Sequence, residues 1–519
     1  MKAQRNDRSG WAIAAALSLF ALLILLPVRT PAVAAQYRII YVDANAGDNT
    51  NDGQTPETAF ATIQYAINDC NDGDTVIIAP GTYTGEGNRD IDFLGKAITV
   101  RSSDPNDATI VAATVIDCNG TTSDPHRAFV FAGDENGNTV LDGLAITNGQ
   151  MPTTPSKPEE TCGGAVACFS ASPTIRNCIV GNSHALLGGG IFLMRSNARI
   201  VNCQFTKNTA TSGGALCGQE VDVSVYDCTF VGNESINGGA LSLTGSRACV
   251  DHCTFTANTA ERWGGALGLS HSDVDVTNCL LTGNSASDGS AIMCEPGPVT
   301  VLNCTITDNT AHDGSAILFH DLPIPHGGAS GPGPGVSVLN SIIWNNPSRT
   351  GEQKPSPYGA APNLSCVEDL DVQPVGIGNT EADPCFVEPG YWDPNGTPED
   401  ANDDFWIDGD YHLKSQAGRW DPATASWARD DVTSPCIDAG DPMTPIGPEP
   451  FPNGGVVNMG AYGGTAEASK PWFAQPLCET IVAGDINGDC IVDFKDMAFI
   501  TMHWLEDRQS GENAAPDGP

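Results

Sequence analysis

Positively charged residues are scarce in this chain of 519 residues: 24 Lys and Arg stand against 63 Asp and Glu, a formal net charge of −39. Nucleic acids and anionic membranes are bound by clustered cations, so this charge balance excludes both as ligands. Signatures of serine hydrolases, phosphate-binding loops and nicotinamide-binding folds are also missing, so no nucleotide is expected. A surface this rich in carboxylates favours divalent cations instead. Disorder, a common property of acidic chains, conflicts with a hydrophobic content of 40%.

Long hydrophobic runs are equally scarce, and the one of note is Trp11–Leu26. Basic residues precede this run and small residues follow it, namely Lys2, Arg5, Arg8 and Ala32–Ala35. This order is typical of a secretory signal peptide, so we expect residues 1–35 to be removed by cleavage after Ala35. The alternative is a retained membrane anchor, for which the run is short. Either way, the rest of the chain is expected to be secreted or displayed at the cell surface.

A repeat of about 25 residues runs through the middle of the chain. Six of the 18 Cys lie 25 or 26 residues apart, at Cys178, Cys203, Cys228, Cys253, Cys279 and Cys304. In each repeat an apolar residue follows the Cys at the second position, an Asn at the fourth or fifth, and Gly-Gly or Gly-Ser near the tenth. A period of this length is typical of solenoids, in which one repeat forms one coil.

Within each repeat, apolar and polar residues alternate over short runs, which predicts β-strands. Asn and Gly between the runs accept the left-handed backbone of tight corners. We therefore predict three strands and three corners per coil, with each strand paired in parallel to its copy about 4.8 Å away. Phe205, Phe230 and Phe255 should stack inside. Corner side chains should bond to one another along a column: Asn182, Asn208, Asn233, Asn258, Asn284 and Asn309.

The Cys column leaves two interpretations open. Small, buried and inert thiols can stack in the core of a solenoid. Disulfide bridges between adjacent coils are the alternative. A metal site is not expected, because a single column does not provide a tetrahedral set of ligands.

The repeated Phe-Thr-x-Asn and Gly-Gly-Ala-Leu motifs resemble the polymorphic outer-membrane protein repeat and, more broadly, the pectin-lyase-like superfamily. This resemblance implies an all-β, right-handed parallel β-helix over residues 36–470. Regular coils are expected at about 95–345 and irregular closing coils at 346–470. The start of the expected domain resembles the N-terminal cap of that superfamily, in which a short helix, here about Ile63–Cys70, covers the open end.

A candidate calcium loop lies near the C-terminus. Oxygen ligands occur at the spacing that Ca²⁺ requires, in Asp485, Asn487, Asp489, Asp493 and Asp496, with the Ile491 carbonyl between them. The loop resembles one half of a type I dockerin, which implies a small α calcium-loop module at 471–510, a disordered tail at 511–519 and a cohesin-like partner. The alternative is a calcium-stabilised tail that binds no partner. Cys490 occupies the usual Gly position, and pairing with Cys478 could brace the loop.

Outward strand positions before each Cys supply the candidate catalytic residues. Asp251, Asp273 and Asp275 are expected to converge beside Arg247, with Tyr226 available to stack on a sugar. Carboxylates on one face suit glycoside hydrolysis, whereas polysaccharide lyases need a cationic base and usually calcium. The competing interpretation is a solvated column of salt bridges, which contributes little to the stability of the fold. Trp263, beside a one-residue insertion, is either a sugar platform or a packed loop residue.

Three functions are consistent with these features. The first is a monomeric carbohydrate-active protein, similar to a lyase or a hydrolase, that acts on extracellular acidic polysaccharide and is tethered through its calcium module. The second is a non-catalytic adhesion protein, a stiff rod that displays loops; the lack of a dense catalytic cluster favours it. A calcium-stabilised structural protein of the cell envelope is a third option.

Overall fold

The structure is a computed structural model that describes residues 37–154, 157–312, 315–319, 335–349, 361–368, 376–397, 404–473, 492–495 and 497. The chain divides into two units, Met1–Arg38 and Ile39–Pro519. The fold below belongs to the second unit. The expected signal peptide, five of the six calcium ligands (Asp485, Asn487, Asp489, Ile491 and Asp496) and the tail at 511–519 lie outside the described residues.

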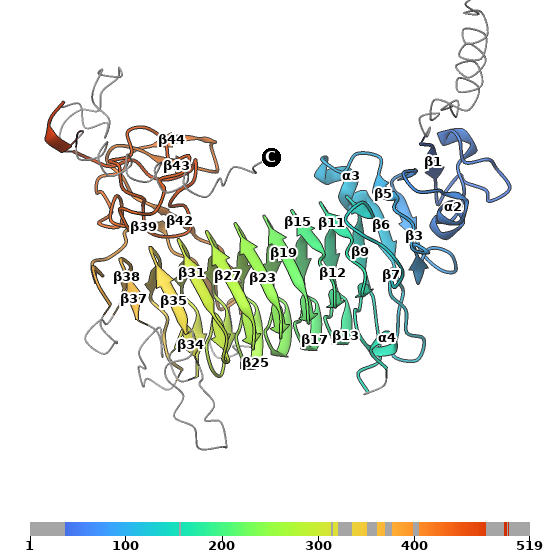
Figure 1. The fold of residues 1–519 in the computed structure, drawn as a ribbon, viewed down its shortest axis with the longest axis horizontal. Coiled ribbons are helices and arrows are strands. Elements are labelled where there is room, and N and C mark those ends of the chain that lie inside the picture. Colours follow the sequence, from blue (N-terminus) through green and yellow to red (C-terminus); the bar gives the residue numbers. More distant parts are fainter. Residues whose placement is uncertain are drawn as a thin grey trace, which may run out of the picture. The chain divides into compact units, whose positions relative to one another are not determined.

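Four parallel sheets form the body of the described chain, and successive strands of each sheet come from successive coils (Figure 1). Sheet A has 12 strands: β1 (Ile39–Val42), β2 (Thr75–Ile78), β5 (Thr99–Ser102), β8 (Val140–Asp142), β11 (Thr174–Arg176), β15 (Arg199–Val201), β19 (Asp222–Tyr226), β23 (Arg247–Asp251), β27 (Asp273–Thr277), β31 (Val299–Leu302), β35 (Val336–Leu339) and β37 (Pro362–Asn363). Sheet B has 11 strands: β3 (Gly81–Tyr83), β6 (Thr114–Asp117), β9 (Ala145–Thr147), β12 (Ile179–Gly181), β16 (Gln204–Thr206), β20 (Thr229–Val231), β24 (Thr254–Thr256), β28 (Leu280–Thr282), β32 (Thr305–Thr307), β36 (Ile342–Trp344) and β38 (Cys366–Val367).

Two smaller sheets close each coil. Sheet C has nine strands: β4 (Ile91–Asp92), β7 (Phe129–Phe131), β10 (Val166–Phe169), β14 (Ile191–Met194), β18 (Leu216–Gln219), β22 (Leu241–Thr244), β26 (Leu267–Ser270), β30 (Ile292–Cys294) and β34 (Ile317–Phe319). Sheet D has six strands: β13 (His184–Leu187), β17 (Thr209–Ser212), β21 (Glu234–Asn237), β25 (Thr259–Trp263), β29 (Ser285–Ala286) and β33 (Thr310–Ala311). The predicted parallel β-solenoid is confirmed, and the right-handed sense is the one that parallel crossovers favour.

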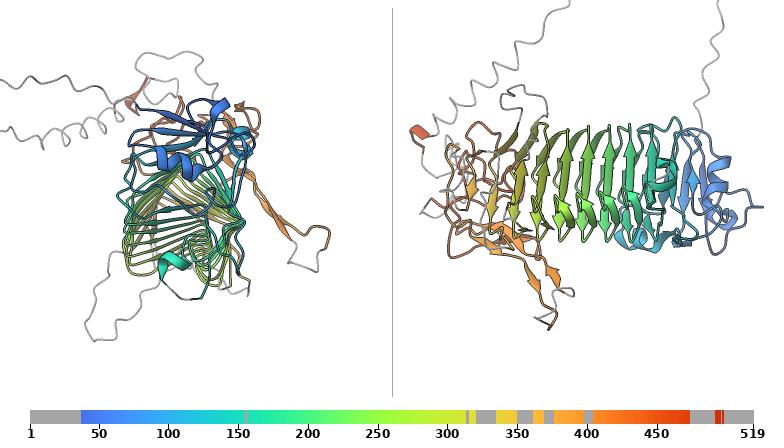
Figure 2. Two further views of the ribbon diagram at one scale, coloured as in Figure 1. Left: turned by 90° about the vertical axis from the view of Figure 1, so that its right-hand side faces the viewer. Right: turned by 90° about the horizontal axis from the view of Figure 1, so that it is seen from below.

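The middle coils contain four strands, not the predicted three, because sheet D forms a strand of its own. Its strands escaped prediction because most of them lack a clear alternation of buried and exposed residues. Thr209–Ser212, for example, is partly buried at every position. Seen along the stack, the coils superpose (Figure 2), as near-identical repeats require.

The core consists of the predicted columns. The Phe205 and Phe230 rings stack with centroids 4.8 Å apart, and the Phe230 and Phe255 rings with centroids 4.6 Å apart. All three side chains are fully buried. This row of aromatic rings confirms the register of the repeat.

The corner amides form the predicted ladder. The Asn208 Nδ2 donates to the Asn233 Oδ1 at 3.0 Å, and the Asn233 Nδ2 donates to the Asn258 Oδ1 at 2.9 Å. The prediction for Asn182 was wrong: Ser183 occupies the ladder position, and its backbone nitrogen donates to the Asn208 Oδ1. Asn182 instead takes the left-handed corner position, with a φ of 50°.

The six column cysteines are buried and free. Each thiol lies against a backbone carbonyl, as where the Cys203 Sγ donates to the Val201 oxygen at 3.3 Å. Burial raises the pKa of Cys203 and Cys279 well above the ordinary thiol value. The structure therefore agrees with the interpretation of stacked, reduced thiols.

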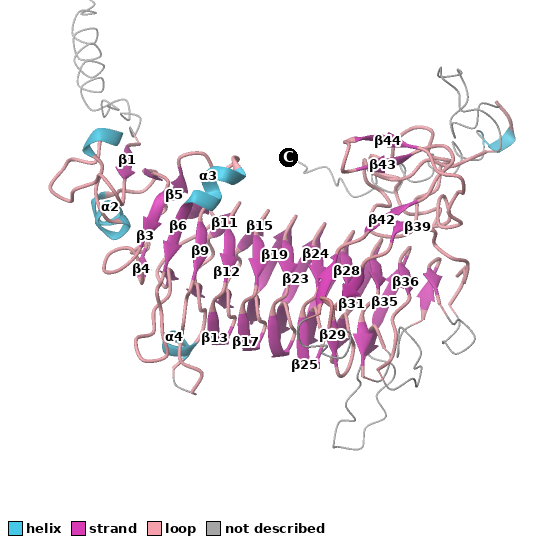
Figure 3. Ribbon diagram, turned by 180° about the vertical axis from the view of Figure 1, so that it is seen from behind, coloured by secondary structure: helices cyan, strands magenta, loops and turns pink. Residues whose placement is uncertain are grey.

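The named helices are short (Figure 3): η1 (Pro56–Thr58), α2 (Ile63–Asp69), α3 (Ala108–Ala113) and α4 (Pro158–Thr161). Helix α2 is the predicted cap. Its Ile63, Ala66 and Ile67 are fully buried and join the core next to β1 and β2. This helix covers apolar side chains that the first coil would otherwise expose.

In its described residues, the segment predicted to form irregular closing coils, 346–470, departs from the regular parallel stack. The last strand of the parallel sheets ends at Val367, a single parallel bridge joins Cys366 to Thr380, and antiparallel hairpins follow. They comprise β39 (Phe386–Glu388) with β42 (Asp410–Leu413), β40 (Tyr391–Asp393) with β41 (Phe405–Ile407), and β43 (Arg419–Asp421) with β44 (Ser426–Ala428). An apolar cluster joins this C-terminal region to sheet B through Ile342, Phe386, Tyr411 and Leu413. The irregular segment thus packs on the side of the last coils.

Candidate functional site

The predicted acidic face, comprising Arg247, Asp251, Asp273 and Asp275, lies on adjacent strands of sheet A. Strand β23 pairs with β27 so that Arg247 is opposite Asp273, and Cys249 is opposite Asp275. Tyr226, in the preceding strand β19, is opposite Asp251. The predicted columns are therefore correct in register. Asp273 and Asp275 are both exposed on the outer face of β27.

The geometry of the acidic face is that of a solvated surface. The Arg247 Nε lies 3.5 Å from the Asp273 Oδ2, and these side chains are 70% and 52% exposed. An ion pair this open to water contributes about 0–1 kcal/mol. Asp273 and Asp275 therefore lack the sheltered environment that a carboxyl needs to act as a general acid.

Asp251 belongs to a different arrangement. Its Oδ1 lies 3.0 Å from the Nδ1 of His252, and this hydrogen bond raises the pKa of His252. The His252 ring lines a cleft of about 350 Å³, together with Asp227, Asn278, Tyr462 and Glu467. Two carboxylates and an imidazole therefore line the junction between the coils and the C-terminal region.

A second cleft, of about 370 Å³, lies where the last coils contact the C-terminal region. We call it the Asp308 cleft. Its walls are Thr307, Asp308, Trp344, Asn345, Asp383, Cys385, Phe386, Pro389, Lys414 and Val432. Two carboxylates, a primary amine and an indole are therefore gathered in one concavity.

Asp308 is the sheltered carboxyl of this cleft. It follows β32 at a corner with a φ of 59°. Its Oδ2 accepts a hydrogen bond from the Tyr411 hydroxyl at 3.0 Å, and its Oδ1 accepts one from the Asn345 amide at 2.5 Å. Burial raises the pKa of the Asp308 carboxyl above its usual value, and these hydrogen bonds offset part of the rise. A carboxyl in this state can donate a proton nearer neutral pH than an exposed one can.

The other functional groups enter the cleft from separate elements. Trp344 ends strand β36 and is half-buried. Asp383 is exposed, and its Oδ1 accepts a hydrogen bond from the Cys385 backbone at 2.8 Å. Lys414 follows β42, where its backbone nitrogen bonds to the Cys385 carbonyl at 3.0 Å. The chain has few cations, so a Lys that lines the same cleft as two carboxylates is a distinctive feature of this cleft.

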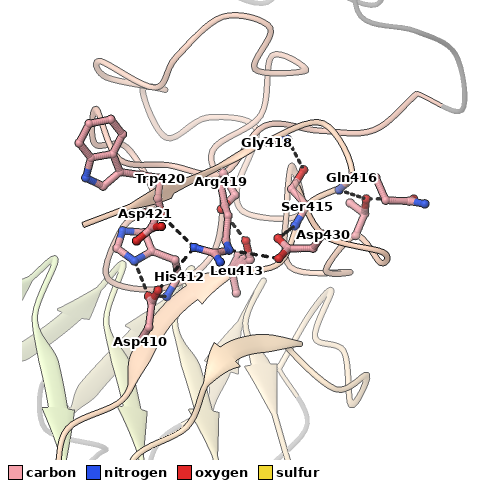
Figure 4. A network of polar contacts seen from close by, with 12 residues as sticks. Asp410, His412, Leu413, Ser415, Gln416, Gly418, Arg419, Trp420, Asp421 and Asp430 are labelled. Carbon is pink, nitrogen blue, oxygen red and sulfur yellow. Dashed lines mark hydrogen bonds and ion pairs between the residues drawn. The ribbon is translucent and has the colours of Figure 1, made fainter. Parts of the chain in front are cut away.

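Strand β42 positions the Tyr411 hydroxyl that contacts Asp308, and its two faces have different environments. Tyr411 and Leu413 point into the apolar cluster beneath the strand. Asp410 and His412 point the other way into a polar network (Figure 4), where the His412 Nδ1 lies 2.6 Å from the Asp410 Oδ1. The Arg419 guanidinium joins this network to Asp430 at 3.2 Å. Pairing on both faces fixes the strand and hence the Tyr411 hydroxyl.

The substrate-binding candidates are also separated. Tyr226 is half-buried on sheet A, whereas Trp263 lies in β25 of sheet D. The predicted insertion at Trp263 is confirmed by a register shift between β21 and β25. Trp263 lines a third hollow, with Ser242, Ser270 and Glu295 among its neighbours. The structure therefore does not unite Tyr226 and Trp263 in one site.

Sequence reasoning missed Asp308, Trp344, Asp383 and Lys414. One signal was available for Asp308. In preceding coils the same left-handed corner is occupied by Lys207, Gly232, Ala257 and Gly283. Asp308 is acidic, whereas the residues at this corner in the preceding coils are neutral or basic, so the sequence departs from the repeat here. Lys414 lies outside the repeat and gave no comparable signal.

The described residues contain no cluster of three or more His, Cys, Asp or Glu side chains arranged to hold a metal ion. Of the predicted calcium ligands only Asp493 is described, and its Oδ1 accepts a hydrogen bond from the Lys495 backbone at 2.7 Å. In the part of the chain that the structure describes, no helix has the length and apolarity needed to cross a membrane.

Two families match short parts of the chain. The family described as Disaggregatase related matches residues 395–440, and the Chlamydia polymorphic membrane protein repeat matches residues 202–219. The second match falls on one of the predicted repeats. Each covers far less than half of the chain. No curated protein matches the sequence.

Several solved structures align with this chain at low identity. Pectate lyase Pel9A aligns over 82% of this chain and 96% of its own, with a TM-score of 0.48 and 16% identity. A rhamnogalacturonan lyase aligns over 70% and 93%, with a TM-score of 0.43 and 13% identity. A GH136 lacto-N-biosidase from Eubacterium ramulus aligns over 64% and 68%, with a TM-score of 0.38 and 13% identity. The fold of this chain is established by its own strand pairing.

Proposed function

We propose that this chain is a secreted carbohydrate-active protein that cleaves an extracellular acidic polysaccharide in the Asp308 cleft. One observation carries the proposal: a partly buried carboxyl with a raised pKa shares a cleft with a second carboxylate, an amine and an indole. A perturbed titratable group in a concave site is a physical marker of catalysis. The exposed acidic face lacks this combination.

The residues suit cleavage of a glycosidic bond. Asp308 donates its proton to the leaving oxygen, and Asp383 serves as the base or nucleophile. The flat face of Trp344 supports a sugar ring through its apolar side. This division of roles requires the two carboxyls to differ in environment, as the partly buried Asp308 and the exposed Asp383 do.

Lys414 favours a substrate that carries carboxylates. Its ammonium group can bind a uronate beside the scissile bond, in a chain whose net charge would otherwise repel it. The same Lys favours a second mechanism, in which its neutral amine removes the proton beside the uronate carboxylate, the C–O glycosidic bond breaks as a C=C bond forms, and Asp308 protonates the leaving oxygen. The products differ, because elimination leaves an unsaturated sugar.

The experiment is a digest of pectate, alginate and related polyuronates by the full chain in the presence of calcium. Reducing ends and the absorbance of unsaturated products are measured together. Replacing Asp308 by Asn should lower turnover by about 10²–10⁴-fold. The matched control is Asp275→Asn on the acidic face, which should retain activity. Activity lost with Asp275→Asn but kept with Asp308→Asn would place the site on sheet A. No product across the panel would favour the adhesion protein.

The C-terminal loop is proposed to bind calcium and to tether the protein to a cohesin-like partner. The spacing of Asp485, Asn487 and Asp489 with their neighbours in the sequence supports this. Titration calorimetry of the full chain with calcium should show heat that Asp485→Ala removes. Unchanged heat in the variant would contradict the assignment.

A further inference from the structure

A crevice separates sheet C from sheet D, and the two rows of side chains that line it can be followed coil by coil. The row on sheet C comprises Ala167, Phe192, Cys217, Ser242, Gly268 and Met293. The row on sheet D comprises Leu187, Ser212, Asn237 and Trp263. The rows face each other, since the Ser212 Oγ donates to the Ser242 Oγ at 2.8 Å.

The first coils fill this crevice with their own side chains. Phe169, Phe192 and Cys217 form a buried apolar cluster that Leu187 completes from sheet D. The Phe169 and Phe192 rings lie 5.8 Å apart. No room for a ligand is left where large residues occupy both rows.

The next coils leave the crevice open. In the sheet C row, the side chain shrinks from Phe192 to Cys217, Ser242 and Gly268, and then grows again at Met293. The result is a hollow of about 190 Å³, which we call the Trp263 hollow. It is lined by Ser212, Asn237, Ser242, Thr244, Trp263, Gly268, Leu269, Ser270, Met293 and Glu295.

One wall of the Trp263 hollow is aromatic because β25 contains an extra residue. Ser235 pairs with Ala260, but Asn237 pairs with Trp263, three residues further along. The Arg262 guanidinium lies 4.5 Å from the centre of the Trp263 ring and helps to hold it. The shift brings an indole into the row that elsewhere contains Ser and Asn.

The remaining walls offer hydrogen-bonding groups. The Asn237 Oδ1 is buried and has no hydrogen-bond partner among the described residues. The Ser270 hydroxyl donates to the Glu295 carboxylate, which faces the same hollow. A buried acceptor without a partner is costly, so a ligand that supplies a hydroxyl there would be favoured.

We propose that the Trp263 hollow binds one neutral pyranose residue of a glycan. A pyranose has an apolar C–H face, which suits the indole, and a rim of hydroxyls, which suits Asn237 and the serines. The Glu295 carboxylate lines the hollow and would repel a uronate, whereas the Arg262 guanidinium lies against the Trp263 ring and is not among the lining residues, so a uronate is disfavoured. This binding site is independent of the Asp308 cleft, whose Lys414 selects acidic sugars.

The test uses the full chain labelled with 5-fluorotryptophan and observed by ¹⁹F NMR. The Trp263 resonance is assigned as the one that Trp263→Phe removes. The probes are the methyl glycosides of glucose, galactose, mannose, xylose and glucuronic acid. At least one neutral glycoside should shift the Trp263 resonance, and the glucuronide should not.

Two variants make the result specific to the hollow. Ser242→Phe places a large ring in the sheet C row, as Phe192 does in the filled coils, and should abolish the shift of the Trp263 resonance. Asn237→Leu should weaken binding about tenfold. Asp308→Asn and Trp427→Phe are the controls and should bind normally, which separates this site from the proposed catalytic function. No shift with any neutral glycoside, or a shift that survives both Ser242→Phe and Asn237→Leu, would overturn the proposal.

Discussion

The Tyr411 hydroxyl donates a hydrogen bond to the Asp308 carboxylate across 3.0 Å, although the two residues lie 103 positions apart in the chain. Tyr411 comes from an antiparallel hairpin, and Asp308 comes from a corner of the repeated coils. The contact therefore joins the irregular C-terminal region to the regular solenoid. Asp308 gains both its burial and a stabilising donor from this packing.

Replacing Tyr411 by Phe should shift the pH dependence of turnover. The hydroxyl stabilises the charged form of Asp308, so its loss raises the pKa of that carboxyl further. Because the general acid must be protonated, the alkaline limb of the pH–rate profile should move to higher pH. An alkaline limb that stays in place would show that Asp308 is not the acid.

The stacked Phe column should dominate the stability of the middle coils. Phe230 is fully buried between two rings, so Phe230→Ala should lower the free energy of unfolding by about 3–5 kcal/mol. Thr229→Ala on the other face of β20 is the control, with a change of about 0.5 kcal/mol. Urea denaturation followed by circular dichroism measures both, and equal losses would contradict the columnar core.

Stability should fall as the pH rises from about 4 to about 8. Burial raises the pKa of Asp438 to about 8, with the charge of Glu449 adding to the rise, and burial raises the pKa of Glu449 to about 7. Below about pH 4 both carboxyls are protonated in the folded and unfolded chains alike. Between these limits only the unfolded chain loses the protons, so folding becomes less favourable.

The variant Asp438→Asn should reduce this slope, whereas Asp273→Asn on the exposed face should leave it unchanged. Urea midpoints at a series of pH values provide the comparison. A slope that Asp438→Asn does not change would mean that other groups cause the dependence.

The column cysteines should resist alkylation in the folded protein. Cys178, Cys203 and their equivalents are buried, whereas Cys249 and Cys385 are partly exposed. Iodoacetamide under native conditions should therefore modify the last two but not the column. Peptide mass spectrometry identifies the modified residues. Disulfide-linked peptides from adjacent coils would show that the column is bridged instead.

Periodicity explains which features the sequence could predict. The Phe column, the amide ladder and the outward columns of β19, β23 and β27 all depend on a local pattern repeated every 25 or 26 residues. Such a pattern fixes the strand register, because a slip of one residue would turn the apolar side chains of a strand from the core to the outer face. Ser183 was missed because the Asn of its coil lies one position earlier, at Asn182, while the in-register ladder position is occupied by Ser.

The Asp308 cleft could not be predicted in this way. It requires Trp344, Asp383 and Lys414 to meet, and the last two come from segments without a repeat. Their positions depend on the packing of β39 and β42 against sheet B, a long-range event that no short pattern encodes. The acidic face was predicted because its columns repeat, although repetition says nothing about whether a carboxyl is sheltered in a cleft.

A crystal structure of the inactive Asp308→Asn variant with a bound oligouronate would locate the site of cleavage. We expect a sugar ring against Trp344, with its carboxylate at Lys414 and its glycosidic oxygen at residue 308. Sugar density over Asp273 and Asp275 on sheet A, with the Asp308 cleft free of carbohydrate, would contradict the proposed site.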